Sequence, residues 1–141
     1  MAKGFHSLDQ QLGWPERPDK LGDIVQVDYG YRTGWLLVAE YETRDGTLWL
    51  TVDNPISYRV HDERELLSYW SQRALEEAPI SIAYEIETSS YLDELRAGAT
   101  GLFGTPLRHF LVSGQNICLE VIAAVLPDLH RSPPVLIKQL L

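Results

Sequence analysis

The chain has 141 residues, a length at which one domain can bury a core of its own, so we expect a single domain over residues 1–141. Hydrophobic residues make up 45% of the chain and charged residues 23%, which excludes the composition of a disordered protein. Twenty acidic and twelve basic side chains give a net charge of −8, which disfavours nucleic acid and anionic membranes as partners and favours a basic protein.

The sequence also indicates a compartment. No segment approaches the roughly 18 apolar residues of a membrane-spanning helix, and the residues after Met1 lack the apolar stretch of a signal peptide. We therefore expect a cytoplasmic protein. The single cysteine, Cys118, lies in an apolar run, cannot form an internal disulfide and is expected to be a small buried hydrophobe.

The first half of the chain predicts strands after an irregular beginning. Residues 1–22 contain two prolines and several glycines, and we expect an irregular N-terminal arm docked through Leu8, Leu12 and Trp14. Strands are predicted over 24–27, 34–42 and 47–52, the last two joined by a type I′ turn at Asp45-Gly46. Asn54-Pro55 ends this pairing, and residues 56–60 predict a further short strand.

The segment from Asp62 to Ala78 predicts the main helix. Asp62 can cap its first turn, Glu65 stands at the capping-box position, and Pro79 prevents continuation. The spacing of the apolar residues is that of an amphipathic helix facing the core. These residues are Leu66, Leu67, Trp70, Ala74, Leu75 and Ala78.

The second half alternates between strands and one short helix. Residues 80–86 alternate with period two and predict a strand with one buried face. Residues 89–97 predict a short helix capped by Thr88, Ser89 or Ser90, and 98–104 a flexible loop. Strands over 107–112 and 117–125, joined by 113–116, are expected at the centre of the sheet.

The remaining residues complete the expected fold. Residues 128–134 are rich in turn-forming residues, and 135–137 predict a last strand or a segment packed on the core. The chain therefore predicts an α+β domain, a mostly antiparallel twisted sheet with one main amphipathic helix (about 62–78) and one short helix (about 89–97).

No spacing in the sequence indicates a cofactor or a metal. The four histidines are scattered without the close spacing of metal ligands, and the glycines of 98–104 lack the pattern of a phosphate-binding loop. We expect neither a cofactor nor a metal ion.

Glu120 is the one acidic residue inside an apolar strand. Alternation places it on one face with Cys118, Ile122 and Ala124. The favoured interpretation is a structural pairing with Arg59, Arg108 or His109. The alternative is a functional role, in which Glu120 and His109 converge in the pocket of a small hydrolase.

Acidic residues concentrate in one third of the chain. Residues 61–97 hold nine acidic and three arginine side chains, a balance of −6, which leaves −2 for the rest. A charged helix face is often merely solvated. Glu76 and Glu77, however, stand in the last turn of the main helix, where the helix dipole disfavours carboxylates by about 0.3–1 kcal/mol each. Such a conflict with stability indicates selection for binding.

Three segments carry a resemblance to a known class of proteins: residues 84–92, residues 108–112, and residues 118–123 with Pro127. They are similar to small bacterial immunity proteins, cytosolic inhibitors that neutralise toxins of contact-dependent or secretion-system competition. The resemblance implies a one-to-one complex between an acidic surface and a basic cognate toxin, often a nuclease. The expected partner-binding residues are Asp62, Glu63, Tyr69, Glu76, Glu77, Glu85, Glu87, Tyr91, Asp93 and Glu94.

Two other classes of function stay open. The chain can be an adaptor or a subunit of a homo-oligomer that joins its partner through a sheet edge or the hairpin at Asp45-Gly46. It can also be the small hydrolase that uses Glu120 and His109. In the favoured interpretation it is not an enzyme.

Overall fold

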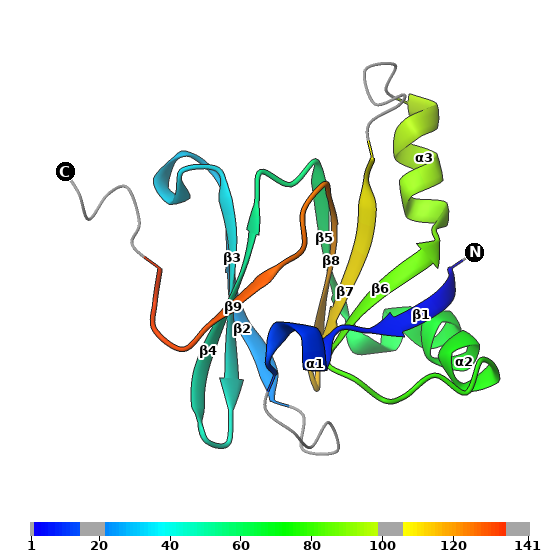
Figure 1. The fold of residues 1–141 in the computed structure, drawn as a ribbon, viewed down its shortest axis with the longest axis horizontal. Helices are drawn as coiled ribbons and strands as arrows, with labels where there is room; N and C mark the ends of the chain where they lie inside the picture. Colours follow the sequence, from blue (N-terminus) through cyan, green and yellow to red (C-terminus); the bar gives the residue numbers. More distant parts are fainter. Residues whose placement is uncertain (1, 15–21, 99–105, 135–141) are drawn as a thin grey trace.

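The computed structural model describes residues 2–14, 22–98 and 106–134, and every structural statement below concerns these residues. They form two antiparallel sheets and three α-helices, which confirms the α+β class (Figure 1). The five-stranded sheet has the order β1 (Lys3–Ser7), β6 (Ala83–Thr88), β7 (Arg108–Ser113), β8 (Ile117–Ala123) and β5 (Ser57–Asp62). The four-stranded sheet has the order β2 (Asp23–Asp28), β3 (Leu36–Thr43), β4 (Gly46–Asp53) and β9 (Asp128–His130).

The main hydrophobic core lies between the two sheets. One face of β3 and β4 meets one face of β7 and β8, because successive side chains of a strand point to opposite sides. Leu8 and Trp14 close the same core from the N-terminal segment. Its strand residues include Leu37, Ala39, Tyr41, Leu50, Val52, Phe110, Leu119 and Val121.

The other face of the five-stranded sheet is covered by helices, at the right of Figure 1. Leu66 and Trp70 pack there against Phe5, Tyr84 and Leu111. A further cluster forms where α3 (Ser90–Gly98) lays Tyr91 and Leu92 over Ile122. The molecule is therefore a sheet sandwich with one helical layer.

The main helix begins as predicted and ends early. Asp62 accepts a hydrogen bond from the Arg64 N–H and Glu65 accepts one from the Asp62 N–H, which completes the capping box. The first turn is a 3₁₀ segment (Glu63–Leu66), followed by α2 (Leu67–Leu75). The tighter first turn changes the phase of the helix, so Leu66 is buried whereas the predicted core residue Leu67 is 62% exposed.

The short helix and both hairpins also match the sequence. Ser89 caps α3 through its hydroxyl, which accepts the Leu92 N–H. The β7–β8 hairpin lies at 113–116 as predicted and its strands are interior. The β3–β4 hairpin is correct, but its turn is Arg44-Asp45, with Thr43 opposite Gly46, and neither turn residue has a positive φ. The predicted type I′ turn is therefore wrong.

The N-terminal segment is more regular than predicted. Residues 3–7 form β1, which pairs with β6, and α1 (Asp9–Leu12) follows. The expectation of an irregular arm is corrected for these residues, because pairing with a strand some 80 residues away cannot be detected from local composition. Docking through Leu8, Leu12 and Trp14 is confirmed, and residues 15–21 lie outside the described part.

Two expectations near the C-terminus have different outcomes. Residues 128–130, which the sequence assigned to a turn-rich segment, form β9 and pair with β4. Three residue pairs at the edge of the sheet are enough to form this short strand. The strand expected at 135–137 lies outside the described residues, as does the loop expected at 98–104 apart from Gly98, the last residue of α3.

Candidate functional site

Glu120 lies on the helix-covered face of β8, with Cys118 and Ile122 beside it as predicted. Arg59 stands directly opposite it on β5, and His61 follows two residues later on the same face. The carboxylate therefore sits at the junction of the β5–β8 pair with the helical layer.

Five hydrogen bonds converge on the Glu120 carboxylate. Its Oε1 accepts from the Tyr69 hydroxyl at 2.6 Å and from His109 Nε2 at 2.7 Å. Its Oε2 accepts from Arg59 at 2.8 and 3.1 Å and from His61 Nε2 at 2.7 Å. We call these five residues the Glu120 cluster. Two of the three partners expected for Glu120 are present, whereas Arg108 pairs with Glu85 instead.

The cluster keeps Glu120 ionised. Burial by itself would raise the pKa of the carboxyl, but the hydrogen bonds from His109 and Tyr69 and the positive charge of Arg59 outweigh burial and lower the pKa to about 2. Burial and the bond to Glu120 raise the pKa of the Tyr69 hydroxyl, so Tyr69 remains a protonated donor.

The neighbouring histidine has one unused nitrogen. His109 is buried, and its Nδ1 has no partner in the described part of the chain. Because an ionised carboxylate only accepts, His109 donates through Nε2.

The geometry supports a structural role for Glu120 more than a catalytic one. Glu120 and His109 make the contact that the hydrolase hypothesis required, at 2.7 Å. Glu120 is 0% exposed and His109 1%, however, and both carboxylate oxygens are already bound by donors. A general base needs a free acceptor position within reach of a substrate. The partly exposed members, Arg59 and His61, are also bound to the same carboxylate.

Glu76, one of the expected partner-binding residues, instead holds the N-terminal strand. Its carboxylate oxygens accept the backbone N–H groups of Gly4 and Phe5, each at 2.9 Å, and one of them also accepts from Gln72. These bonds hold the pKa of Glu76 below its usual range. The conflict between Glu76 and the helix dipole therefore has an explanation inside the fold.

Several other expected contact residues are also engaged by the fold. Asp62 caps the helix and pairs with Arg64, and Glu85 binds Arg108 through both oxygens. Tyr69 belongs to the Glu120 cluster.

Tyr91 requires a correction. It is only 4% exposed, because its ring lies under the Arg59 guanidinium, 3.6 Å from the Cζ atom, and packs against the sheet. It is therefore not available as an aromatic anchor at the surface.

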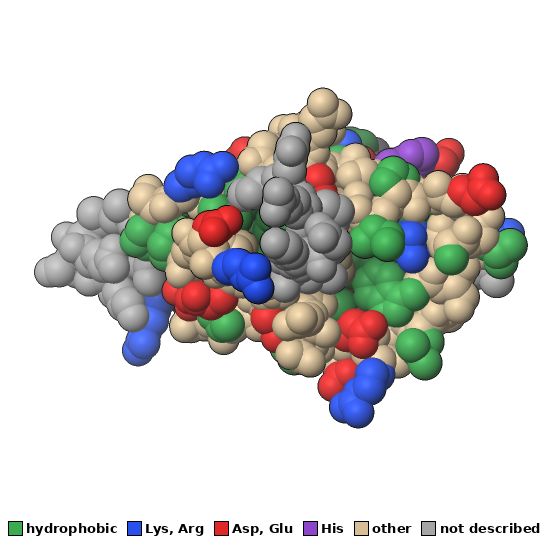
Figure 2. All heavy atoms as spheres, turned by 90° about the horizontal axis from the view of Figure 1, so that it is seen from below, with side chains coloured by type: hydrophobic (Ala, Val, Ile, Leu, Met, Phe, Trp, Pro, Cys, Tyr) green, Lys and Arg blue, Asp and Glu red, His purple; other side chains and the backbone are tan. Residues whose placement is uncertain are grey.

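The remaining expected residues keep their charge at the surface. In the described part of the chain, the side chains of Glu63, Glu77, Asp93 and Glu94 make no hydrogen bond or ion pair, and Glu87 pairs with the exposed His6. Figure 2 shows acidic groups separated by basic and uncharged side chains on one face, with hydrophobic side chains gathered toward the end where α2 lies. The acidic surface is thus a set of separate carboxylates.

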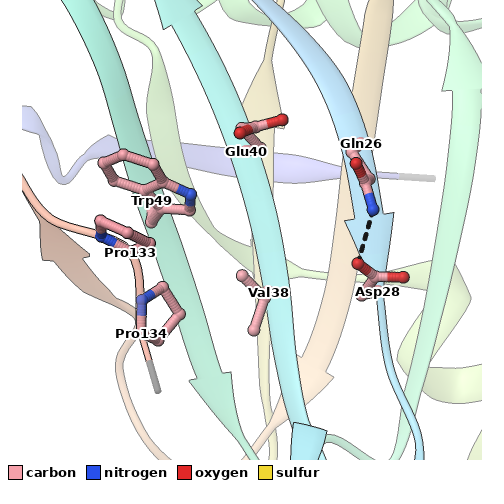
Figure 3. Close-up of a pocket in the computed structure, with 7 residues that line it drawn as sticks. All are labelled: Gln26, Asp28, Val38, Glu40, Trp49, Pro133 and Pro134. Atoms are coloured by element: carbon pink, nitrogen blue, oxygen red, sulfur yellow. Dashed lines mark hydrogen bonds between the residues drawn. The ribbon is translucent and has the colours of Figure 1, made fainter. Parts of the chain in front are cut away.

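A second surface lies on the outer face of the four-stranded sheet and was not predicted. Gln26, Glu40, Trp49 and His130 stand opposite one another across four strands. The first three of them border a groove lined by Gln26, Asp28, Val38, Glu40, Trp49, Pro133 and Pro134 (Figure 3). The pairing of Glu40 with Trp49 could have been predicted from the sequence, because it follows from the register of the β3–β4 hairpin.

Among residues 2–14, 22–98 and 106–134, no group of three His, Cys, Asp or Glu side chains could hold a metal ion. No described helix is long and apolar enough to cross a bilayer. Cys118 is buried, and burial raises the pKa of its thiol to about 11.

In comparisons with known proteins, no family model, no curated protein and no solved structure matches the chain.

Proposed function

We propose that the chain is a cytosolic immunity protein that binds and inhibits a basic bacterial toxin through exposed carboxylates. The observation that carries the proposal is the group of Glu63, Glu77, Asp93 and Glu94, whose side chains make no hydrogen bond or ion pair with another described residue. Folding does not account for these four charges, so they remain available to a cationic surface. The group excludes Asp62, Glu76 and Glu85, whose charges the fold uses.

The elements that bear these carboxylates also expose apolar side chains. Asp93 and Glu94 lie on α3, and Glu77 follows α2, both on the outer side of the five-stranded sheet (Figure 1). Leu75 is 79% exposed and Ile80 58%, on either side of Glu77. A specific interface combines apolar contacts at its centre with a charged rim. Carboxylates in the rim increase the association rate with a basic partner.

The resemblance of residues 84–92, 108–112 and 118–123 to immunity proteins supplies the class of partner. In such a complex the carboxylates would cover the cationic groups with which a nuclease binds phosphate. Catalysis by the chain itself is not required, and the burial of Glu120 agrees with this proposal.

A co-expression experiment tests the proposal. The probe is the C-terminal domain of a large secreted protein encoded immediately upstream of this chain, expressed from an inducible promoter in a sensitive host. We expect the chain to restore growth, and the triple variant Glu77→Lys, Asp93→Lys and Glu94→Lys to lose protection while it unfolds at the same temperature as the wild type. Growth arrest in the presence of soluble wild-type chain would refute the proposal.

The matched control reverses charge at a distance from these carboxylates. Asp45→Lys and Asp53→Lys change two exposed acids at the two ends of β4, outside the groove, and should leave protection intact, whereas Asp93→Lys with Glu94→Lys, which changes the net charge by the same amount, should lose it. Equal loss of protection in the control would show that only the net charge matters, and not the carboxylates on α3 and after α2.

A second candidate function, a homo-oligomeric subunit, is favoured by the edge strand β5. One face of its chain exposes Ile56, Tyr58 and Val60, at 44%, 37% and 48%. Tyr58 contacts Tyr29, which in turn contacts the exposed Trp35. Exposed apolar edge strands readily pair with another chain. Sedimentation equilibrium of wild type and Val60→Lys tests this candidate, since a monomer at all concentrations would exclude it.

A further inference from the structure

The groove on the outer face of the four-stranded sheet combines an aromatic wall with a free carboxylate. Trp49 and Glu40 stand directly opposite each other on β4 and β3. In Figure 3 the Trp49 ring and the two prolines border one side of the groove, and Glu40 and Asp28 lie across from them. Helices α2 and α3 pack on the five-stranded sheet, so neither of them covers this face.

The two carboxylates of the groove have unequal surroundings. Asp28 accepts a hydrogen bond from Gln26 at 2.7 Å through Oδ2. The side chain of Glu40 has no hydrogen bond or ion pair in the described part of the chain. Among the described residues that line the groove there are two acids and no Lys or Arg, so this lining is complementary to a cation.

We propose that this groove binds an arginine side chain of the basic partner, stacked on Trp49 and hydrogen-bonded to Glu40. A cation is attracted by the face of an indole ring, and tryptophan is the best of the aromatic residues for this contact. Side chains directly opposite on antiparallel strands have Cβ atoms about 5 Å apart, a spacing that one long side chain can bridge.

Arginine fits this arrangement better than lysine. Its planar guanidinium can lie flat on the indole and on the faces of Pro133 and Pro134 while its edge donates two parallel bonds to a carboxylate. An ammonium group is more strongly hydrated and has no flat face. The inference rests on the proposed function only in that the partner is basic, and it names one contact that the partner makes.

A spectroscopic titration of the full chain tests the inference. The ¹⁵N-labelled protein is titrated with acetyl-hexaarginine amide, and the indole N–H signal of Trp49 is identified by its loss in Trp49→Phe. We expect this signal to shift in a saturable manner with hexaarginine and to stay in place with the uncharged hexacitrulline peptide. Hexalysine should bind more weakly.

Two variants with the same change of charge give the decisive comparison. Glu40→Gln should weaken hexaarginine binding at the groove about tenfold, as expected for the loss of a charge-assisted hydrogen bond. Asp53→Asn removes an exposed acid at the end of β4, outside the groove, and should change the affinity less than about twofold. Equal effects of the two variants would overturn the inference.

The remaining outcomes separate this inference from the proposed function. If hexaarginine shifts only signals of α2 and α3, the groove is excluded while the acidic surface gains support. If hexalysine shifts Trp49 as strongly as hexaarginine, the assignment of arginine is overturned. If no signal moves, the groove inference fails, and the co-expression experiment still decides the proposed function.

Discussion

The Glu76 side chain accepts the backbone N–H of Phe5, 71 residues away in the sequence, at 2.9 Å. With the second bond, to Gly4, one carboxylate fixes two consecutive amides of β1. Its neighbour Glu77 has a left-handed backbone, with φ 55°, and its side chain has no partner in the described residues. Of these two adjacent glutamates at one helix end, Glu76 is thus bound to β1, whereas the Glu77 side chain is not bound by any described residue.

Glu76→Gln should lower the free energy of unfolding by about 1–3 kcal/mol, because an amide side chain cannot accept both N–H groups of β1. Glu77→Gln is the matched control and should change it by less than about 0.5 kcal/mol. Urea denaturation measures both variants. Hydrogen exchange of the Gly4 and Phe5 amides should accelerate in Glu76→Gln alone, and equal exchange in the two variants would contradict this assignment.

Glu120→Gln should lower the free energy of unfolding by about 3 kcal/mol, because the positive charge of Arg59 would remain next to the buried site without its counter-charge. Glu94→Gln, on the exposed face of α3, is the control and should be nearly neutral. A stable Glu120→Gln protein would instead point to a functional reason for this carboxylate.

The same carboxylate predicts a dependence of stability on pH. Its pKa is about 2 in the folded chain and 4.5 ordinarily, so the folded state holds the proton less tightly than the unfolded state. The stabilisation is therefore complete above about pH 4.5 and is lost as pH falls toward 2. The difference in unfolding free energy between wild type and Glu120→Gln should shrink over this window, and a constant difference would argue against an ionised Glu120.

Trp35 combines exposure with an unfavourable backbone conformation. It has φ 63° and is 52% exposed. Trp35→Gly should relieve strain of about 1 kcal/mol and lose an edge contact with Tyr29 of similar size, so the melting temperature should hardly change. A large loss of stability would show that Trp35 is mainly a packing residue. Loss of self-association at unchanged stability would instead support the β5 edge as an interface between copies of the chain.

The elements predicted from the sequence are those with local causes. The capping box at Asp62 and Glu65 marks the start of the helix, and alternation around Glu120 gives its face correctly. The division into two sheets could not be predicted, because alternation shows which residues share a face but not which strand lies beside them. Arg59 reaches Glu120 only because β5 pairs with β8.

The candidate site was predictable to a smaller extent. Arg59 and His109 were among the partners expected for Glu120, but Tyr69 and His61 were not, since their positions depend on how α2 and β5 meet. The distribution of acids identified a segment without showing that the fold uses several of them. Only the contacts of each carboxylate separate Glu76 from Glu77.

Strand β8 is apolar on both sides, since Leu119 and Val121 face the other sheet while Cys118 and Ile122 face the helices. Hydrophobicity alone would not distinguish the native register of β8 from one shifted by one residue, because either set of side chains can be buried in either layer. A one-residue slip would move Glu120 into the sandwich core, away from all five of its donors. The buried charge therefore favours the native register of β8. It destabilises the shifted registers, which an all-apolar β8 would allow.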